Sequence, residues 1–161
     1  MIPTTLILPL FLMAPVVNVD ASGAVIGRMT LDAPITEVRK IVGDAVKVGK
    51  LVPQVKSVTA QPAGACVTLA VVSAGFIGDV EYKSRRCPTK TGWAEHLTSS
   101  DDLKQMDAIW TLTERGEQTD VHFSLVVDVG AYAPTVLVQS LTKTQVETTL
   151  TNLRDQVAAL P

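Results

Sequence analysis

The chain is short of cysteines, aromatic residues and charges, and these shortages exclude several classes of protein. Two of its 161 residues are cysteines and 4% are aromatic. Charged residues make up 19% of the chain, whereas about a quarter is usual in globular domains. The net charge is -2 and no basic stripe occurs, which argues against a nucleic-acid partner. We interpret the adjacent Arg85 and Arg86 as a solvated strand end rather than an anion site. A chain of this length is expected to form one domain with its own core.

Recognisable catalytic and metal-binding motifs are also missing. His96 and His122 have no Ser or Cys partner at a motif spacing, so no nucleophilic triad is predicted. The segment Gly75–Gly78 lacks the Lys and Ser/Thr that follow in a phosphate-binding loop. Asp101 and Asp102 are most simply a turn, because calcium needs further oxygen ligands. We therefore expect neither a metal nor a cofactor.

The N-terminus carries the longest hydrophobic run, Leu6 to Val17, whose twelve residues are all apolar or proline. This run is too short for a bilayer span, which needs roughly twenty residues, but it suits a signal peptide. Val19-Asp20-Ala21 follows and fits cleavage after Ala21. We predict a signal peptide over residues 1–21, a single domain over residues 22–161, and export to the periplasm or the medium.

One feature of the leader leaves alternatives open. Residues 1–5 contain no Lys or Arg, whereas a signal peptide usually begins with positive charge. The segment is then an N-terminal strand, a disordered extension or an uncleaved membrane anchor, and a cytoplasmic location is the alternative to export. No cysteine lies near Ala21, so lipoprotein anchoring has no support.

The two cysteines give an independent indication of the compartment. Ala65–Ser73 and Asp79–Cys87 alternate apolar and polar residues and are predicted to form a hairpin. If this hairpin is centred on residues 76–77, Cys66 lies directly opposite Cys87, close enough for a disulfide. A disulfide would agree with an oxidising compartment. The alternative is two free thiols on the outer face of the sheet.

The order of the remaining elements predicts a curved antiparallel sheet that packs around a C-terminal helix and leaves a cavity for an apolar guest. A first strand, Ala24–Leu31, precedes two short helices that start at Ala33-Pro34 and are broken by Gly43 and Gly49. A second strand is expected over Pro53–Thr59. A turn at residues 61–64 and further strands of period-two alternation follow, and residues 115–117 form the last hairpin turn.

A long amphipathic helix closes the chain after Pro134, which suits a helix start because proline lacks the donor that would be unpaired there. Its apolar residues form one stripe, and the concave face of the sheet is the surface that this stripe can cover. The stripe consists of Leu137, Leu141, Val146, Leu150, Leu153 and Val157.

Several short segments occur in an order typical of one superfamily. They are Leu31-Asp32-Ala33-Pro34 with Val38, Val52-Pro53-Gln54-Val55, residues 77–82, Ala108-Ile109-Trp110-Thr111-Leu112, Ala133-Pro134 and Leu153-Arg154. In this order they resemble the START-like superfamily, also called SRPBCC, which includes polyketide cyclase/dehydratase and coenzyme Q-binding branches. The resemblance covers about Ala24 to Leu160. It departs from the common pattern at Arg39, where an aromatic is frequent, and at Ala108, where glycine is frequent.

The resemblance implies an α+β helix-grip fold. A seven-stranded antiparallel sheet would wrap around the C-terminal helix and leave a cavity for lipids, quinones, sterols or polyketides. We expect this pocket to be lined by Val67, Leu69, Val71, Val80, Tyr82, Trp93, Glu95, Met106, Trp110, Phe123, Leu137 and Leu141.

Two polar residues are candidates for chemistry inside the pocket. Strand alternation sends Glu95 inward with Trp93 and Leu97, and burial would raise the pKa of its carboxyl. Glu95 could then bind a guest carbonyl or act as an acid/base, unless the strand is bulged or exposed and Glu95 is solvated. Tyr82 either orients a guest through its hydroxyl or is simply core packing.

Three functions follow from this sequence. The first is an exported carrier that binds a hydrophobic small molecule, lipid or quinone, compatible with a transient membrane contact. The second is a cyclase/dehydratase-like enzyme that uses Glu95 or Tyr82. The third is a structural or partner-binding module whose core is filled by its own side chains. The sequence makes no prediction of the oligomeric state.

Overall fold

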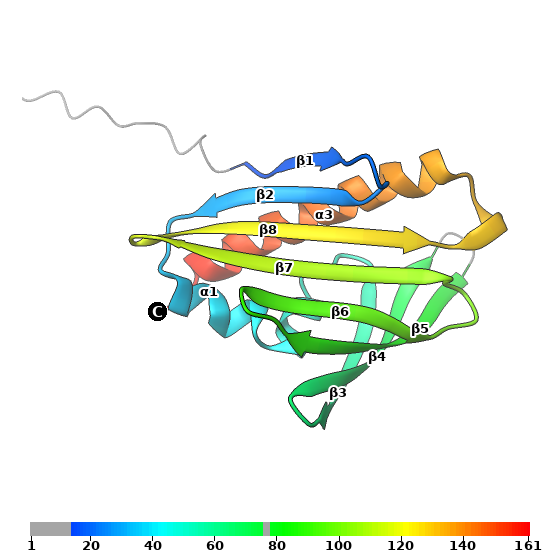
Figure 1. Cartoon of the computed structure of the whole chain (residues 1–161), viewed down its shortest axis with the longest axis horizontal. Coiled ribbons are helices and arrows are strands. Elements are labelled where there is room, and N and C mark those ends of the chain that lie inside the picture. The colour runs from blue at the N-terminus through cyan, green and yellow to red at the C-terminus, as the bar shows by residue number, and fades with distance from the viewer. Residues whose placement is uncertain (1–13, 76–77) are drawn as a thin grey trace, which may run out of the picture.

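A computed structural model describes residues 14–75 and 78–161 of the chain. Most of the hydrophobic leader and the centre of the predicted hairpin turn, residues 76–77, lie outside the described residues. One curved antiparallel sheet organises the rest, and its strand order is β1-β2-β8-β7-β6-β5-β4-β3 (Figure 1). The strands are β1 (Val16–Val19), β2 (Val25–Leu31), β3 (Val55–Ala63), β4 (Cys66–Gly75), β5 (Gly78–Pro88), β6 (Gly92–Ser99), β7 (Gln105–Arg115) and β8 (Gln118–Asp128).

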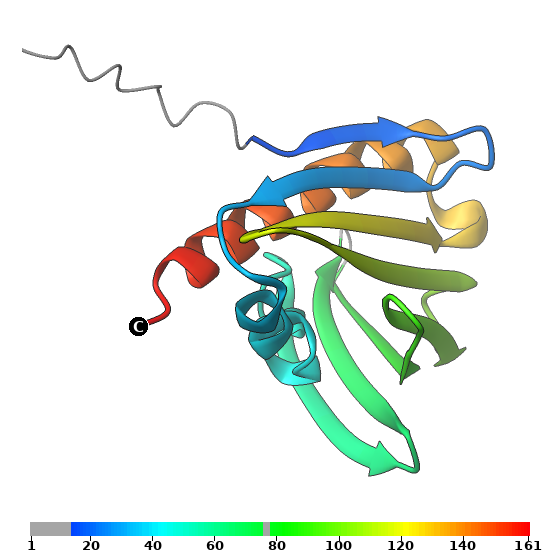
Figure 2. The same ribbon diagram turned by 60° about the vertical axis from the view of Figure 1, so that its left-hand side comes forward.

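Two short helices connect β2 to β3, as the sequence predicts. They are α1 (Ile35–Val42) and α2 (Ala45–Gly49), and Gly43 ends the first of them. The Asp44 carboxylate begins the second by accepting hydrogen bonds from the first free backbone N–H groups of α2. This pair of helices packs at one end of the sheet, where β3 and β4 bend away from the other strands (Figure 2).

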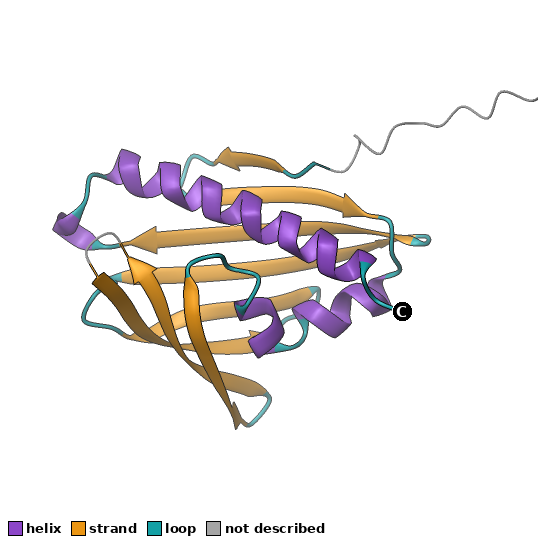
Figure 3. Cartoon of the chain, turned by 180° about the vertical axis from the view of Figure 1, so that it is seen from behind, coloured by secondary structure: helices purple, strands orange, loops and turns teal. Residues whose placement is uncertain are grey.

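The long helix α3 (Thr135–Ala158) lies across the concave side of the sheet (Figure 3). It follows a short 3-10 helix, η2 (Gly130–Tyr132), and packs mainly against β2 and β8. Gly27 of β2 makes this approach possible, because a Cβ there would lie 2.5 Å from Leu150 and 2.6 Å from Val146. The absence of a side chain at one position therefore sets the distance between helix and sheet.

The predicted apolar stripe of α3 is confirmed in its second half only. Val146, Leu150, Leu153 and Val157 are buried against the sheet. Leu137 and Leu141 are 45% and 39% exposed; Leu141 lines the cavity as expected, whereas Leu137 does not. The first turns of α3 lie over a cavity rather than directly on the strands, and side chains there have fewer atoms to pack against.

The inward faces of the central strands follow the predicted alternation. Met106, Ala108, Trp110 and Leu112 of β7 are all buried, and so are the alternate residues of β8. Trp110 pairs across the strands with Phe123, and their rings stack with centroids 4.1 Å apart. This aromatic pair belongs to the main hydrophobic core.

The hairpin β4–β5 has the register that the sequence predicts. Val71 lies opposite Tyr82, and the same register brings Cys66 opposite Cys87. The two cysteines form a disulfide, with their Cα atoms 4.3 Å apart. Of the two alternatives left open by the sequence, the structure contains the disulfide rather than two free thiols.

Two expectations about the sheet require correction. The sheet has eight strands instead of seven, because β1 adds an outer strand next to β2. This strand lies within the segment predicted as leader, so cleavage after Ala21 would leave seven strands. The hairpin turn expected at residues 61–64 lies at residues 64–65, since β3 continues to Ala63. Pro62 is tolerated there because β3 is an edge strand and needs partners on one side only.

No helix among the described residues is long and apolar enough to cross a membrane.

Replacement of Cys66 and Cys87 by alanine should lower the free energy of unfolding by about 3 kcal/mol, because the bond closes a loop with a sequence separation of 21 residues. Chemical denaturation of both proteins measures this difference. Equal stability, or a native chain whose denatured mass is not two hydrogens below the fully reduced value, would contradict the disulfide.

Gly27→Ala should destabilise the protein by about 1–3 kcal/mol, because the new methyl group overlaps Val146 and Leu150. Arg28→Ala, on the exposed side of the same strand, is the control and should change the stability much less. Thermal unfolding measures both. A neutral Gly27→Ala would mean that α3 does not approach β2 this closely.

Candidate functional site

A cavity of about 420 Å³ lies between the concave face of the sheet, α2 and the first half of α3. This volume falls within the usual range for small-molecule sites, about 300–1,000 Å³. Most of the wall is apolar, and the polar groups belong to a few residues from the sheet, from α3 and from the turn before β3. The wall includes Ala45, Val48, Val55, Val58, Ala108, Leu125, Val127, Val138, Tyr82, Glu95, Thr142, Gln145 and Thr149.

The structure places most of the sequence-predicted pocket residues in this wall. They come from neighbouring strands and from α3, and the antiparallel register brings their side chains to one face. These residues are Leu69, Val71, Val80, Tyr82, Glu95, Met106, Trp110, Phe123 and Leu141.

The other three predicted residues lie outside the cavity wall. Val67 is half-buried and packs against Ala45 and Leu69, which line the cavity while Val67 itself does not. The ring of Trp93 packs close to Gly43 at the end of α1, and it therefore contacts this helix instead of the cavity. Leu137 is largely exposed on the first turn of α3. Strand and helix periodicity give the correct face for these residues, but not their position along the element.

Sequence analysis missed all the cavity residues of α2 and β3, and further ones on the central strands and on α3. Ala108 and Leu125 share the parity of predicted neighbours in their strands, so alternation could have found them. Thr142, Gln145 and Thr149 are polar and escaped a search for an apolar stripe. The two threonines can face inward because each hydroxyl donates to a carbonyl of the preceding helical turn, at 2.7 Å.

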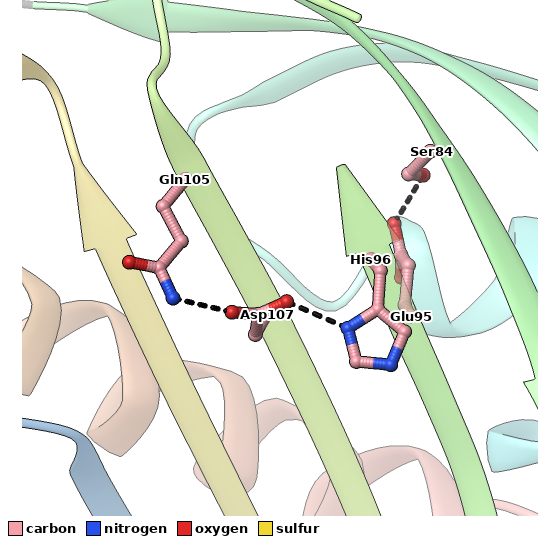
Figure 4. A network of polar contacts seen from close by, with 5 residues as sticks. All are labelled: Ser84, Glu95, His96, Gln105 and Asp107. Carbon is pink, nitrogen blue, oxygen red and sulfur yellow. Dashed lines mark hydrogen bonds and ion pairs between the residues drawn. The ribbon is translucent and has the colours of Figure 1, made fainter. Parts of the chain in front are cut away.

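Glu95 points into the cavity, which decides between the two alternatives for this residue. The pairing of β5 and β6 shifts at Lys83/Ser84, yet Glu95 remains on the inner face opposite Ala108. The Ser84 hydroxyl donates a 2.6 Å hydrogen bond to its Oε1 atom (Figure 4). Burial raises the pKa of the Glu95 carboxyl, while the Ser84 hydrogen bond and the charge of Arg86 oppose that rise.

Arg86 was interpreted as solvated, and this interpretation is wrong. Its side chain is 3% exposed, because it shares the parity of Tyr82 and Ser84 on the inner face of β5. The guanidinium donates to the carbonyl of Val42 and lies 5.1 Å from the centre of the Trp93 ring. Arg86 therefore links α1 to the sheet behind the cavity wall.

Arg86 and Glu95 form a buried charge pair across β5 and β6. The two residues are direct cross-strand neighbours. Burial lowers the pKa of Arg86 to about 10, and the charges of Glu95 and then Asp44 oppose that decrease. Arg86 thus keeps its proton at neutral pH. A neutral Glu95 would leave this buried cation without the counter-charge that acts on it most strongly, which is costly, so we assign Glu95 as ionised.

Tyr82 supplies the second polar group on the sheet side of the cavity. Burial, and secondarily the charge of Glu95, raises the pKa of its phenol above the ordinary value. The hydroxyl therefore keeps its proton at all physiological pH values and can donate a hydrogen bond to a guest.

A second polar network lies on the outer face of the same strands. His96 Nδ1 is 2.6 Å from Asp107 Oδ1, and Gln105 donates to Asp107 Oδ2 at 2.6 Å (Figure 4). His96 is 59% exposed and points away from Glu95, its neighbour in the strand. His122 also lies on the outer face, as expected. Within residues 14–75 and 78–161, no group of three or more acidic, His or Cys side chains could hold a metal.

This arrangement can bind an apolar guest and position one polar group of it. The ionised carboxylate of Glu95 accepts hydrogen bonds and the Tyr82 phenol donates one. Chemically, the same two groups could also transfer a proton to or from a guest.

Comparison with known proteins identifies the fold. No family model and no curated protein matches the chain. Among solved structures, the protein TTHA0849 from Thermus thermophilus superposes with a TM-score of 0.75 at 20% identity, over 84% of this chain and 97% of that one. A START superfamily protein from Mycobacterium smegmatis gives 0.74 at 15% identity, over 86% and 99%.

Two further neighbours carry functional names. The Zhui aromatase/cyclase from Streptomyces sp. R1128 gives a TM-score of 0.65 at 12% identity, over 84% of this chain and 93% of that one. Human StAR-related lipid transfer protein 5 gives 0.66 at 11% identity, over 88% and 80%. At these low identities, the structural similarity establishes the fold alone, and any function has to be argued from the cavity of this chain. The chain has the START-like helix-grip fold.

Proposed function

We propose that this protein binds and carries a hydrophobic small molecule or lipid in the cavity between the sheet and α3. The observation that carries the proposal is the apolar cavity of about 420 Å³ beneath the first half of α3, the part of this helix that does not pack directly on the strands. Covering about 300 Å² of apolar guest surface would contribute roughly 7 kcal/mol before the costs of binding. Lipids, quinones and other largely apolar molecules meet this description.

The structural neighbours support a ligand-binding role. One is named a lipid transfer protein and another an aromatase/cyclase, and each of these roles requires a bound small molecule. A cavity of this size gives no support to the third hypothesis, a module with a filled core.

We further propose that the carrier works outside the cytoplasm. Cys66 and Cys87 form a disulfide, which persists in oxidising compartments, and a leader-like run precedes the domain. A guest would enter where α3 begins, beside the exposed Val136 and Leu137. These apolar side chains suit a transient contact with a membrane that donates or receives the guest.

A cyclase/dehydratase-like enzyme is the second candidate, and the geometry at Glu95 is the observation that favours it. A carboxylate of raised pKa and a phenol, Tyr82, line the same cavity. Such a pair could act as acid and base on a guest carbonyl. The carrier remains our first proposal because it needs only the apolar cavity.

Blocking the cavity should abolish binding. Ala108→Phe places a ring in the cavity opposite Glu95 and should weaken binding of a neutral apolar dye by about tenfold or more. Ile109→Phe, the next residue on the outer face, is the matched control and should bind normally. Dye fluorescence measures affinity, and circular dichroism confirms folding.

If Ala108→Phe does not fold, Val80→Trp at the half-buried part of the wall serves the same purpose. Undiminished binding by a folded, cavity-blocked variant would contradict the proposed site.

Glu95→Gln separates the two candidate functions. A carrier should keep its affinity for an apolar guest within roughly threefold, because most of the binding energy comes from apolar contact. An enzyme that depends on this carboxylate should lose about 100-fold or more of its turnover. Binding titrations and product analysis with a polyketide-type substrate measure the two effects. Turnover by the native protein that is lost in Glu95→Gln would replace the carrier proposal with the enzyme.

A further inference from the structure

Among the described residues that line the cavity, one is charged, and it is the acidic residue Glu95. Glu95 lines the cavity, whereas Arg86, its cross-strand neighbour, does not. Arg86 is directed to the Val42 carbonyl and the Trp93 ring, behind the wall. A guest therefore meets the carboxylate and not the guanidinium that balances it.

The carboxylate retains capacity for a guest. Ser84 donates one hydrogen bond to Oε1, and an ionised carboxylate offers about four acceptor positions in all. The residue directly opposite on β7 is Ala108, whose small side chain leaves room in front of Glu95. An acceptor in an apolar wall favours a guest that brings a donor, because an unsatisfied buried polar group is costly.

The charge balance around Glu95 excludes an anionic guest group at this position. Arg86 is the cation that acts on Glu95 from the neighbouring strand, and its guanidinium is directed to the Val42 carbonyl, so a guest carboxylate or phosphate would add an uncompensated negative charge beside Glu95. Like charges placed together in a site of low polarity repel strongly. The remaining polar groups of the wall, including Tyr82, Thr142 and Gln145, are uncharged and cannot compensate a second anion.

We propose that the guest carries an uncharged hydrogen-bond donor, such as a hydroxyl, that binds Glu95, and that Glu95 excludes guests with a carboxylate or phosphate at that end. This inference rests on the proposed carrier function and makes it specific. It predicts a neutral, alcohol-like amphiphile rather than a fatty acid.

A matched series of ligands tests the inference. Dodecanol, the methyl ketone of the same chain length and dodecanoic acid compete with a neutral naphthylamine dye on the whole, delipidated protein at about pH 8, where the acid is ionised. Dodecanol should bind roughly tenfold or more tightly than the acid, and the ketone, which lacks a donor, should bind less tightly than the alcohol.

Glu95→Gln is the decisive variant. Its amide can accept from a hydroxyl and donate to a carboxylate, and the charge of Arg86 is then no longer compensated by Glu95, so the acid should gain roughly tenfold or more in affinity relative to the alcohol. Because a buried Arg86 without its counter-charge can destabilise the protein, circular dichroism confirms that the variant is folded before its affinities are compared. Asp107→Asn removes one negative charge from the outer face and controls for net charge. This control should keep the discrimination of the native protein.

The outcomes separate this inference from the carrier proposal. Equal affinity of the native protein for alcohol and acid, or discrimination that survives Glu95→Gln, would overturn the inference while the carrier stands. If neither the dye nor any of the three ligands binds, the carrier proposal and this inference both fall.

Discussion

The packing of one half of α3 against the sheet is the contact on which the rest of the structure depends. Gly27 lets the helix approach β2 closely enough for Val146 and Leu150 to be buried. The same helix then continues past this contact, over strands that curve away from it. Its second half packs into the hydrophobic core, and its first half covers the cavity, which side chains do not fill. Stability and the capacity to bind thus come from opposite ends of one helix.

A second constraint lies behind the cavity wall. Arg86 links α1 to the sheet, and burying its charge is tolerable because Glu95 and Asp44 lie near it. This structural role fixes Glu95 in an apolar cavity where a carboxylate would otherwise be unfavourable. The charge that a guest meets is therefore a consequence of how the helices are attached to the sheet. Such coupling explains how a cavity that is mostly apolar can still select among guests.

Much of the fold could be predicted from the sequence because its signals are periodic. Alternation in the strands indicated the inner faces of β7 and β8, and Gly43 divided the two short helices correctly. The hairpin register placed Cys66 opposite Cys87 from the position of one turn. Local sequence was less informative at the edges of the sheet. Pro62 was taken for a turn residue because edge position, which permits proline in a strand, depends on the whole sheet.

The site was predicted less completely than the fold, for physical reasons. Periodicity shows which way a side chain points, but not whether a neighbour covers it, so Trp93 and Leu137 were expected in the cavity. Arg86 lies on the same face of its strand as Tyr82, but we expected it to be exposed to solvent because it is charged. Its counter-charge and aromatic partner come from residues elsewhere in the chain. Thr142 and Thr149 were missed because they are polar; they can face the cavity because their hydroxyls donate to carbonyls of their own helix.

Native mass spectrometry of the protein purified from its own host, without detergent, shows directly whether the cavity holds a guest. We expect a folded protein with an additional mass that disappears on denaturation and belongs to a largely apolar, uncharged molecule. A protein that is empty when isolated and that takes up no such molecule from a total lipid extract of that host would contradict the proposed carrier function.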